Sequence, residues 1–218
     1  VGTIQGQYIK DQLDLDNAAG PFNIELTTGD PGDNNARFFF GGAMDVLQPY
    51  IDEGKLVVKS GQVAFEEVAT ANWATDAAQS RMDAIIAANY SDGTTLHACM
   101  CSNDSTALGV ANSLEANYTG EWPIITGQDC DIASVKNILA GKQSMSIFKD
   151  TRTLAAKVVE MVDAIMKGEE PPINDTETYD NEVKVVPTYI LEPQVVVKDD
   201  VQGTLVDSGF VSADEVGL

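Results

Sequence analysis

The chain has 218 residues, of which 44% are hydrophobic, so it is long enough to bury the core of one large or two small domains. Its 34 acidic residues outnumber 13 basic ones, which gives a formal net charge of −21. This charge argues against nucleic acid as a partner, because phosphate binding needs a basic face. It also disfavours an anionic membrane surface, and it is typical of a secreted bacterial protein.

No stretch reaches the roughly 18 apolar residues that a bilayer span requires, and no signal peptide is present. Val1 opens directly into a helical pattern, so we expect that sequence upstream of it is missing.

The chain has few residues that could bind a transition metal. They are three cysteines, Cys99, Cys101 and Cys130, and a single histidine, His97. An odd cysteine count does not form a disulfide framework, and a zinc site needs about four N or S ligands. We therefore expect buried free thiols, no metal and no cofactor. His97 lies inside an apolar strand pattern, which favours a core position over catalysis.

Short apolar strands alternate with amphipathic helices along the chain. In chain order, the pattern predicts a helix at 2–13, a strand at 22–26, a helix at 34–51, a strand at 55–59, a helix at 76–90, a strand at 94–101, a helix at 104–118, a strand at 122–126, a helix at 131–140, a strand at 144–148, a helix at 151–166, strands at 183–191 and 195–197, and a short helix at 199–205. Such alternation predicts an α/β fold, a Rossmann-like parallel sheet with helices on both faces. The acidic, proline-bearing segment 168–181 is expected to be an exposed connector.

Polar residues cluster just after the predicted strands, at the edge where open parallel sheets bind ligands. The candidate ligand-binding residues are Asn34, Asn35, Trp73, Asn103, Asp129 and Lys149. This set suits a sugar, whose C–H faces stack on an indole ring. Each sugar hydroxyl both donates and accepts a hydrogen bond. Carboxylates, amides and ammonium groups together supply the matching acceptors and donors.

Each candidate also has a structural alternative. Asp104 and Asp131 fall at helix starts and are expected to be N-caps, and Asn103 or Asp129 could serve the same purpose. Trp73 could belong to the core, although its neighbours are polar, and Lys149 could be a solvated surface charge.

Catalytic motifs are absent from the sequence. It contains no G-x-S-x-G elbow, no P-loop and no G-x-G-x-x-G after a strand, so we expect a protein that is not an enzyme. A pair of glycosidase carboxylates would have to be set roughly 5–10 Å apart, which sequence alone leaves open.

Several segments carry a resemblance to a known family. The run GDPGDNNA at 29–36 with FFF at 38–40, VLQPYIDEGKL at 46–56, SND at 102–104, GQD at 127–129 and FKDTR at 148–152 are similar to the periplasmic xylose-binding and multiple-monosaccharide-binding receptors. Further matches are VKVVP at 183–187 and VDSGF at 206–210, in the same order and spacing. The chain therefore resembles the type 1 periplasmic sugar-binding proteins of ABC transporters.

The resemblance implies two Rossmann-like lobes that close over a sugar. Residues 1–149 would form the carboxy-terminal lobe, 150–190 a remnant of the amino-terminal lobe, and 191–218 a return to the carboxy-terminal lobe. Most of the amino-terminal lobe would be absent, so the apolar face of the 151–166 helix would lack its usual partner.

The resemblance also implies an extracytoplasmic protein that captures an aldopentose or aldohexose between its lobes and delivers it to an ABC transporter permease. It would be periplasmic or extracellular, a lipoprotein whose membrane anchor lies outside this chain. Trp73 would stack on the sugar, Asn103, Asp129 and Lys149 would bind hydroxyls, and the loop of Asn34 and Asn35 would reach over it. The sequence leaves one alternative, the effector-binding core of a sugar-responsive transcription regulator.

Two positions depart from the family pattern, and one family feature is missing. Asn72 stands where some relatives carry arginine, and Cys130 stands where alanine is common. The first departure leaves the sugar undetermined. No D-x-[DN]-x-[DN]-G loop occurs, so we expect no calcium site.

Overall fold

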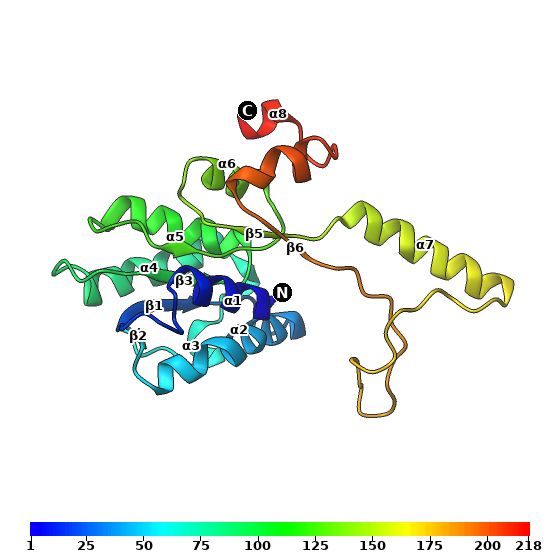
Figure 1. Ribbon diagram of the computed structural model, residues 1–218, viewed down its shortest axis with the longest axis horizontal. Helices are drawn as coiled ribbons and strands as arrows, with labels where there is room; N and C mark the ends of the chain where they lie inside the picture. Colours follow the sequence, from blue (N-terminus) through cyan, green and yellow to red (C-terminus); the bar gives the residue numbers. More distant parts are fainter. The chain divides into compact units, whose positions relative to one another are not determined.

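Four parallel strands form the central sheet of this protein, whose computed structural model describes residues 1–218 (Figure 1). The strands are β1 (Phe22–Thr27), β2 (Leu56–Val58), β3 (Ala98–Cys101) and β4 (Ile124–Ile125), in the spatial order β2-β1-β3-β4. The chain leaves β1 for β2 on one side and then crosses to β3 on the other. The order of strands thus reverses between β1 and β3, the place where open α/β sheets form a ligand crevice.

The register sets the carboxyl ends of β1 and β3 level, and β4 ends two residues before β3. Thr27 is opposite Cys101 in the pairing of β1 with β3, and Cys99 is opposite Ile125 in the pairing of β3 with β4. Loops that follow these three strands therefore start at one edge of the sheet.

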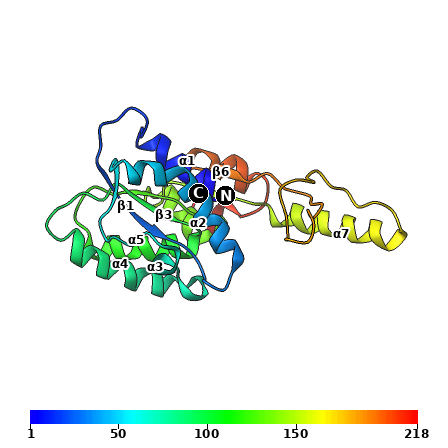
Figure 2. The same ribbon diagram turned by 90° about the horizontal axis from the view of Figure 1, so that it is seen from below.

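Helices cover both faces of the sheet, as the sequence predicts (Figure 2). They are α1 (Gly2–Gln12) and α2 (Asn34–Asp52) on one face, and α4 (Thr75–Asn89) and α5 (Asp104–Asn117) on the other. Because side chains alternate along a strand, Ala98 and Met100 belong to the core under α1 and α2, whereas Cys99 and Cys101 belong to the core under α4 and α5. The predicted α/β class is confirmed.

Shorter elements complete the structure around this sheet. They are α3 (Phe65–Val68), the 3₁₀ turn η1 (Ala71–Trp73), α6 (Ile132–Leu139), β5 (Ser146–Phe148), β6 (Gln194–Val196), the 3₁₀ turn η2 (Lys198–Asp200), the π-helix η3 (Val201–Val206) and α8 (Ala213–Val216). The sequence pattern did not predict α3, η1 or α8, each of which has only three or four residues. The predicted helix at 199–205 is present as η2 and η3.

The chain divides into two compact units, Val1–Ile147 with Val195–Leu218, and Phe148–Gln194. The second unit contains one long helix, α7 (Thr151–Lys167), which starts at its cap Asp150 and ends at Gly168 with φ 73°. None of the residues in α7 is buried. The division into receptor lobes stays a prediction.

One predicted strand is wrong. Residues 183–191 form no regular strand and take part only in isolated bridges, between Asp180 and Val185 and between Asp175 and Thr188. The apolar alternation there has no neighbouring strand to pair with, because an isolated hairpin has too little buried surface to persist. No helix anywhere in the protein combines the length and the apolar character that crossing a membrane would need.

Candidate ligand-binding site

An open hollow of about 680 Å³ lies beyond the carboxyl end of β1. Its lining residues are Asp30, Gly32, Asp33, Asn34, Asn72 and Trp73. One large aromatic ring is thus surrounded by carboxylates and amides, at the edge of the sheet where the strand order reverses. Two of the predicted site residues, Asn34 and Trp73, meet in this hollow.

Trp73 owes its position to two acidic residues of the loop after β1. Its indole Nε1–H donates to Asp33 Oδ2 at 3.3 Å, and the backbone N–H of Asn72 donates to Asp30 Oδ2 at 2.5 Å. Asn72 and Trp73 have φ values of 56° and 55°, in the left-handed region that non-glycine residues rarely adopt. Such a conformation persists only where neighbouring contacts impose it, as Asp30 and Asp33 do here.

The indole ring also packs directly on the backbone of Gly29. A Cβ added at Gly29 would lie 2.1 Å from ring carbons of Trp73, so only glycine allows this approach. The N–H of Thr70 donates to the carbonyl of Gly29 at 2.9 Å, which ties the two loops together. Trp73 is half-buried, with part of its ring at the hollow.

Asn34 and Asn35 open α2 at the rim of the hollow, and both are exposed. The helix is capped by Asp33, whose Oδ1 accepts from the N–H of Asn35 at 2.8 Å. Asp33 therefore holds both the start of α2 and the indole of Trp73. The sequence patterns did not single out Asp30 or Asp33 as residues that position this loop.

Asn103 follows β3 and is 7% exposed. It is the N-cap of α5, because its Oδ1 accepts from the N–H of Thr106 at 3.1 Å, and its Nδ2 donates to Ser105 Oγ at 3.0 Å. The expectation that Asp104 caps this helix is wrong, since Asn103 takes that place and Asp104 is the first helical residue.

Asp129 follows β4 and is exposed, with φ 104°. The N–H of Asp104 donates to the carbonyl of Gln128 at 2.9 Å, which brings the turns of Asn103 and Asp129 together. Asp131 is the N-cap of α6 by position, but its side chain makes no capping bond.

Hydrogen bonds join the carboxyl ends of β1 and β3, so the loops that follow these strands lie at the same edge of the sheet. Ser102 donates from its N–H to the carbonyl of Thr27 at 3.1 Å, and from its hydroxyl to Thr28 Oγ1 at 2.9 Å. The turns of Asn103 and Asp129 therefore follow adjoining strand ends, and Trp73 is held by the loop that follows β1.

Gln5 on α1 is a further residue of this edge that the sequence patterns did not identify. It is fully buried, and its Nε2 donates to the carbonyls of Cys101, Ser102 and Gly127 at 3.1, 3.2 and 2.9 Å. A polar residue on the apolar side of a helix indicates such a buried contact. Gln5 thus joins α1 to the ends of β3 and β4.

Lys149 belongs to the second unit and is exposed. It lines a hollow of about 230 Å³ within that unit, together with Asp150 and Leu191 among others. The hydrogen bond from Arg152 lowers the pKa of Asp150 to about 2. Lys149 is the one predicted site residue outside the first unit.

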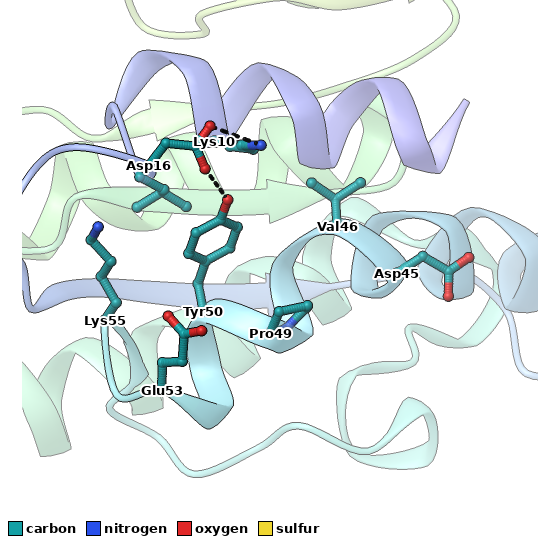
Figure 3. A pocket seen from close by; sticks show the side chains of 9 residues that line it. Lys10, Asp16, Asp45, Val46, Pro49, Tyr50, Glu53 and Lys55 are labelled. Carbon is teal, nitrogen blue, oxygen red and sulfur yellow. Dashed lines mark hydrogen bonds and ion pairs between the residues drawn. The ribbon is translucent and has the colours of Figure 1, made fainter.

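A second hollow, of about 460 Å³, lies between α1 and α2 near the amino end of β2 (Figure 3). Asp16 accepts from the hydroxyl of Tyr50 at 2.5 Å and pairs with Lys10 Nζ at 3.1 Å. The bond from Tyr50, followed by that from Lys10, lowers the pKa of Asp16. These polar groups bind one another, so this hollow offers less to a polyhydroxylated ligand than the one at Trp73.

The cysteines and the histidine have structural positions, as expected. Cys99, Cys101 and Cys130 are buried free thiols, and burial raises the pKa of each. His97 is half-buried, and its Nδ1 accepts from the N–H of Asn23 at 2.9 Å. Burial lowers its pKa, so the ring is a neutral acceptor near pH 7.

Known proteins were found that resemble this chain over almost its full length. Residues 1–170 match the family described as periplasmic binding protein domain. The multiple sugar-binding periplasmic receptor ChvE of Rhizobium radiobacter is 49% identical over 99% of this chain and 62% of its own length. The D-xylose-binding periplasmic protein of Escherichia coli is 34% identical over 89% of this chain and 56% of its own length.

Solved structures agree with these matches. An ABC transporter solute-binding protein from Clostridium phytofermentans, with bound β-D-glucose, is 66% identical with a TM-score of 0.96 over 99% of this chain and 66% of its own. A carbohydrate transporter solute-binding protein from Chloroflexus aurantiacus, in complex with D-glucose, is 32% identical with a TM-score of 0.84. The chain spans 62% of the length of the Rhizobium receptor, and it belongs to the periplasmic binding protein domain family.

Proposed function

We propose that the protein is an extracytoplasmic solute-binding protein that binds a monosaccharide at the carboxyl edge of its sheet and delivers it to the permease of an ABC importer. The named relatives support this, because they are sugar-binding periplasmic receptors or solute-binding proteins of ABC transporters. The proposed ligand is an aldopentose or aldohexose. The proposed location is periplasmic or extracellular, with attachment to the membrane through a lipid anchor.

The observation that carries this proposal is the placement of Trp73. A half-buried indole, fixed by Asp33 and Gly29, lines a polar hollow beyond the carboxyl end of β1. An aromatic ring that is partly exposed to solvent suits a ligand that has one apolar and one polar side. A pyranose is such a ligand.

The hydroxyl groups of the sugar would be bound by the polar residues that the sequence singles out. We assign Asn34 and Asn35 to the rim of the hollow, and Asn103, Asp129 and Lys149 to direct hydrogen bonds. Asn103 Oδ1 already accepts from Thr106, so its contribution would come from the amide Nδ2, which has a second proton beyond the one donated to Ser105. Asp129 would accept, and Lys149 would donate.

The transcription-regulator alternative is not favoured, since the named relatives are sugar-binding periplasmic proteins and an ABC transporter solute-binding protein. A catalytic role is not favoured either. The polar residues of the hollow hold backbone and indole N–H groups, and they include no nucleophile bonded to a base.

Isothermal titration calorimetry with D-glucose and D-xylose tests the proposal. Trp73→Ala should weaken binding about tenfold, because stacking adds on the order of 1 kcal/mol to the lost apolar contact. The matched control is Trp122→Ala, which removes the other tryptophan. Trp122 lies on the amino side of β4 and donates to the carbonyl of Lys142 at 3.0 Å.

Unchanged affinity in the Trp73 variant, or an equal loss in the Trp122 variant, would contradict the assignment of the site. Binding of neither sugar by the unmodified chain would count against the proposed function itself.

A further inference from the structure

The turn that presents Asp129 has an unusual backbone conformation. Asp129 has φ 104° and Cys130 has φ 56°, and neither is glycine. Two consecutive residues of this kind stay in place only where surrounding groups impose the conformation. The contacts of the 129–131 turn therefore decide where the Asp129 carboxylate lies.

All three backbone N–H groups of the turn have acceptors. Asp129 donates to the carbonyl of Ile147 at 2.9 Å, Cys130 to Ser146 Oγ at 3.1 Å, and Asp131 to Asp104 Oδ2 at 2.9 Å. The hydroxyl of Ser146 in turn donates to Asp104, at 2.9 Å to Oδ1. Two of the three N–H groups thus depend on Asp104, directly or through Ser146.

The Asp104 carboxylate is 1% exposed and is surrounded by donors. Besides Asp131 and Ser146, Gln143 donates from Nε2 to Oδ1 at 2.9 Å. The carboxylate packs closely against Gly127, because a Cβ added at Gly127 would lie 2.2 Å from Asp104 Oδ1. We call Asp104, Gln143 and Ser146 the Asp104 cluster.

We propose that Asp104 is a positioning residue, whose buried carboxylate holds the 129–131 turn in the conformation that presents Asp129 to the ligand. This inference rests on the proposed function, since it assumes that Asp129 binds a sugar hydroxyl. Asp104 itself is buried beneath the turn and acts through the groups that it binds.

The ionised form of Asp104 suits this task, because three donors point at it and no acceptor does. A protonated carboxyl would have to turn one donor away, and its bond to the Asp131 N–H would lose the assistance of the charge. Burial, which outweighs the three hydrogen bonds, raises the pKa of Asp104 to about 7. The hydrogen bonds by which Asp104 fixes the 129–131 turn should therefore weaken as the pH falls from 8 to 6.

The other titratable groups around Asp104 are the thiols of Cys101 and Cys130 and the carboxyl of Asp131. The thiols of Cys101 and Cys130 have their pKa raised by burial to about 12 and stay neutral. Burial and the charge of Asp129 raise the pKa of Asp131, whose negative charge in turn raises that of Asp104. The negative charge of Asp131 thus adds to the effect of burial on the pKa of Asp104.

Two measurements on the 218-residue chain test the inference. The first needs no ligand. The hydrogen-exchange protection of the Cys130 and Asp131 amides should fall about fivefold between pH 8 and pH 6, after correction for intrinsic exchange. The second is calorimetry with D-glucose, whose affinity should fall by a similar factor over the same range.

Three variants separate positioning from a general effect on folding. Asp104→Asn should abolish both pH dependences, and Ser146→Ala should weaken glucose binding at pH 8 by about fivefold by removing the acceptor of Cys130. The control is Asp76→Asn, which removes an exposed carboxylate from the first turn of α4 and should change neither.

Each outcome decides a different point. Exchange that does not vary with pH, or that varies equally in Asp104→Asn, would overturn the role of Asp104. Exchange that varies while glucose affinity does not would overturn its link to the ligand. Failure of glucose to bind at every pH, with the exchange effect intact, would overturn the proposed function and leave the hold on the turn established.

Discussion

The helices α5 and α7 are of similar length, yet α5 is largely buried and α7 is exposed. Eight of the residues in α5 are buried, Leu114 completely, whereas α7 has none. The apolar residues of α7 recur at Leu154, Val158, Val162 and Ile165, a spacing that places them on one face. Amphipathic spacing thus predicts a helix and its apolar face, but burial depends on a partner that comes from elsewhere in the chain.

The largest expected effect comes from removing the same side chain in the two helices. Leu114→Ala should lower the free energy of unfolding by about 2–5 kcal/mol, because it leaves a cavity in a packed core. Leu154→Ala, at a position that is 49% exposed, should change it by less than about 0.5 kcal/mol. Urea denaturation of the two variants measures both values.

Equal losses in the two leucine variants would contradict the comparison. They would show that the apolar face of α7 is packed in solution as tightly as that of α5.

A smaller effect is expected from pH, and it again differs between the units. Asp104 in the first unit has a pKa of about 7, above its ordinary value of 3.8, so below pH 7 the folded state binds a proton that the unfolded state has released. Stability should therefore rise by about 1 kcal/mol as the pH falls from 8 to 6. Burial raises the pKa of Glu25 as well, which acts in the same direction.

In the second unit, Asp150 has its pKa lowered to about 2 and stays ionised in both states over this range. Asp150→Asn should thus leave the pH dependence of stability between 8 and 6 unaltered, whereas Asp104→Asn should reduce it. The reverse result in urea denaturation would refute the assignment of this pH effect to Asp104.

The smallest effect concerns the surface of α7. Its exposed apolar residues should bind a fluorescent dye such as anilinonaphthalene sulfonate, and the double substitution of Val158 and Ile165 by lysine should reduce the fluorescence about twofold. These two side chains are 51% and 61% exposed. Dye fluorescence that is unaffected by the double substitution would show that the face is covered in solution.

The alternation of strands and helices was predictable because each element carries its own periodicity. The helix predicted at 34–51 is α2, and the strand predicted at 22–26 is β1, each within one residue at its ends. The strand predicted at 183–191 failed because a strand needs a neighbour, which periodicity does not provide. The turn η1 was not predicted, because it depends on contacts from Asp30 that are distant in sequence.

The candidate site was predictable only in part. Strand ends point to Asn103 and Asp129, since polar residues follow apolar runs there, and Trp73 stands out as an aromatic in a polar stretch before a helix. The supporting residues were harder to find. Asp104 looked like a helix cap from its position, and only the fold shows that it is buried against Gln143 and Ser146.

The measurement that tests the central claim most directly is a nuclear magnetic resonance titration of the isotope-labelled 218-residue chain with D-glucose. The account predicts that the indole N–H of Trp73 and the amides of Asn34, Asn103 and Asp129 shift with one common binding curve. Shifts confined to the hollow around Tyr50, or no shifts at all, would contradict the claim that the carboxyl edge of the sheet binds the sugar.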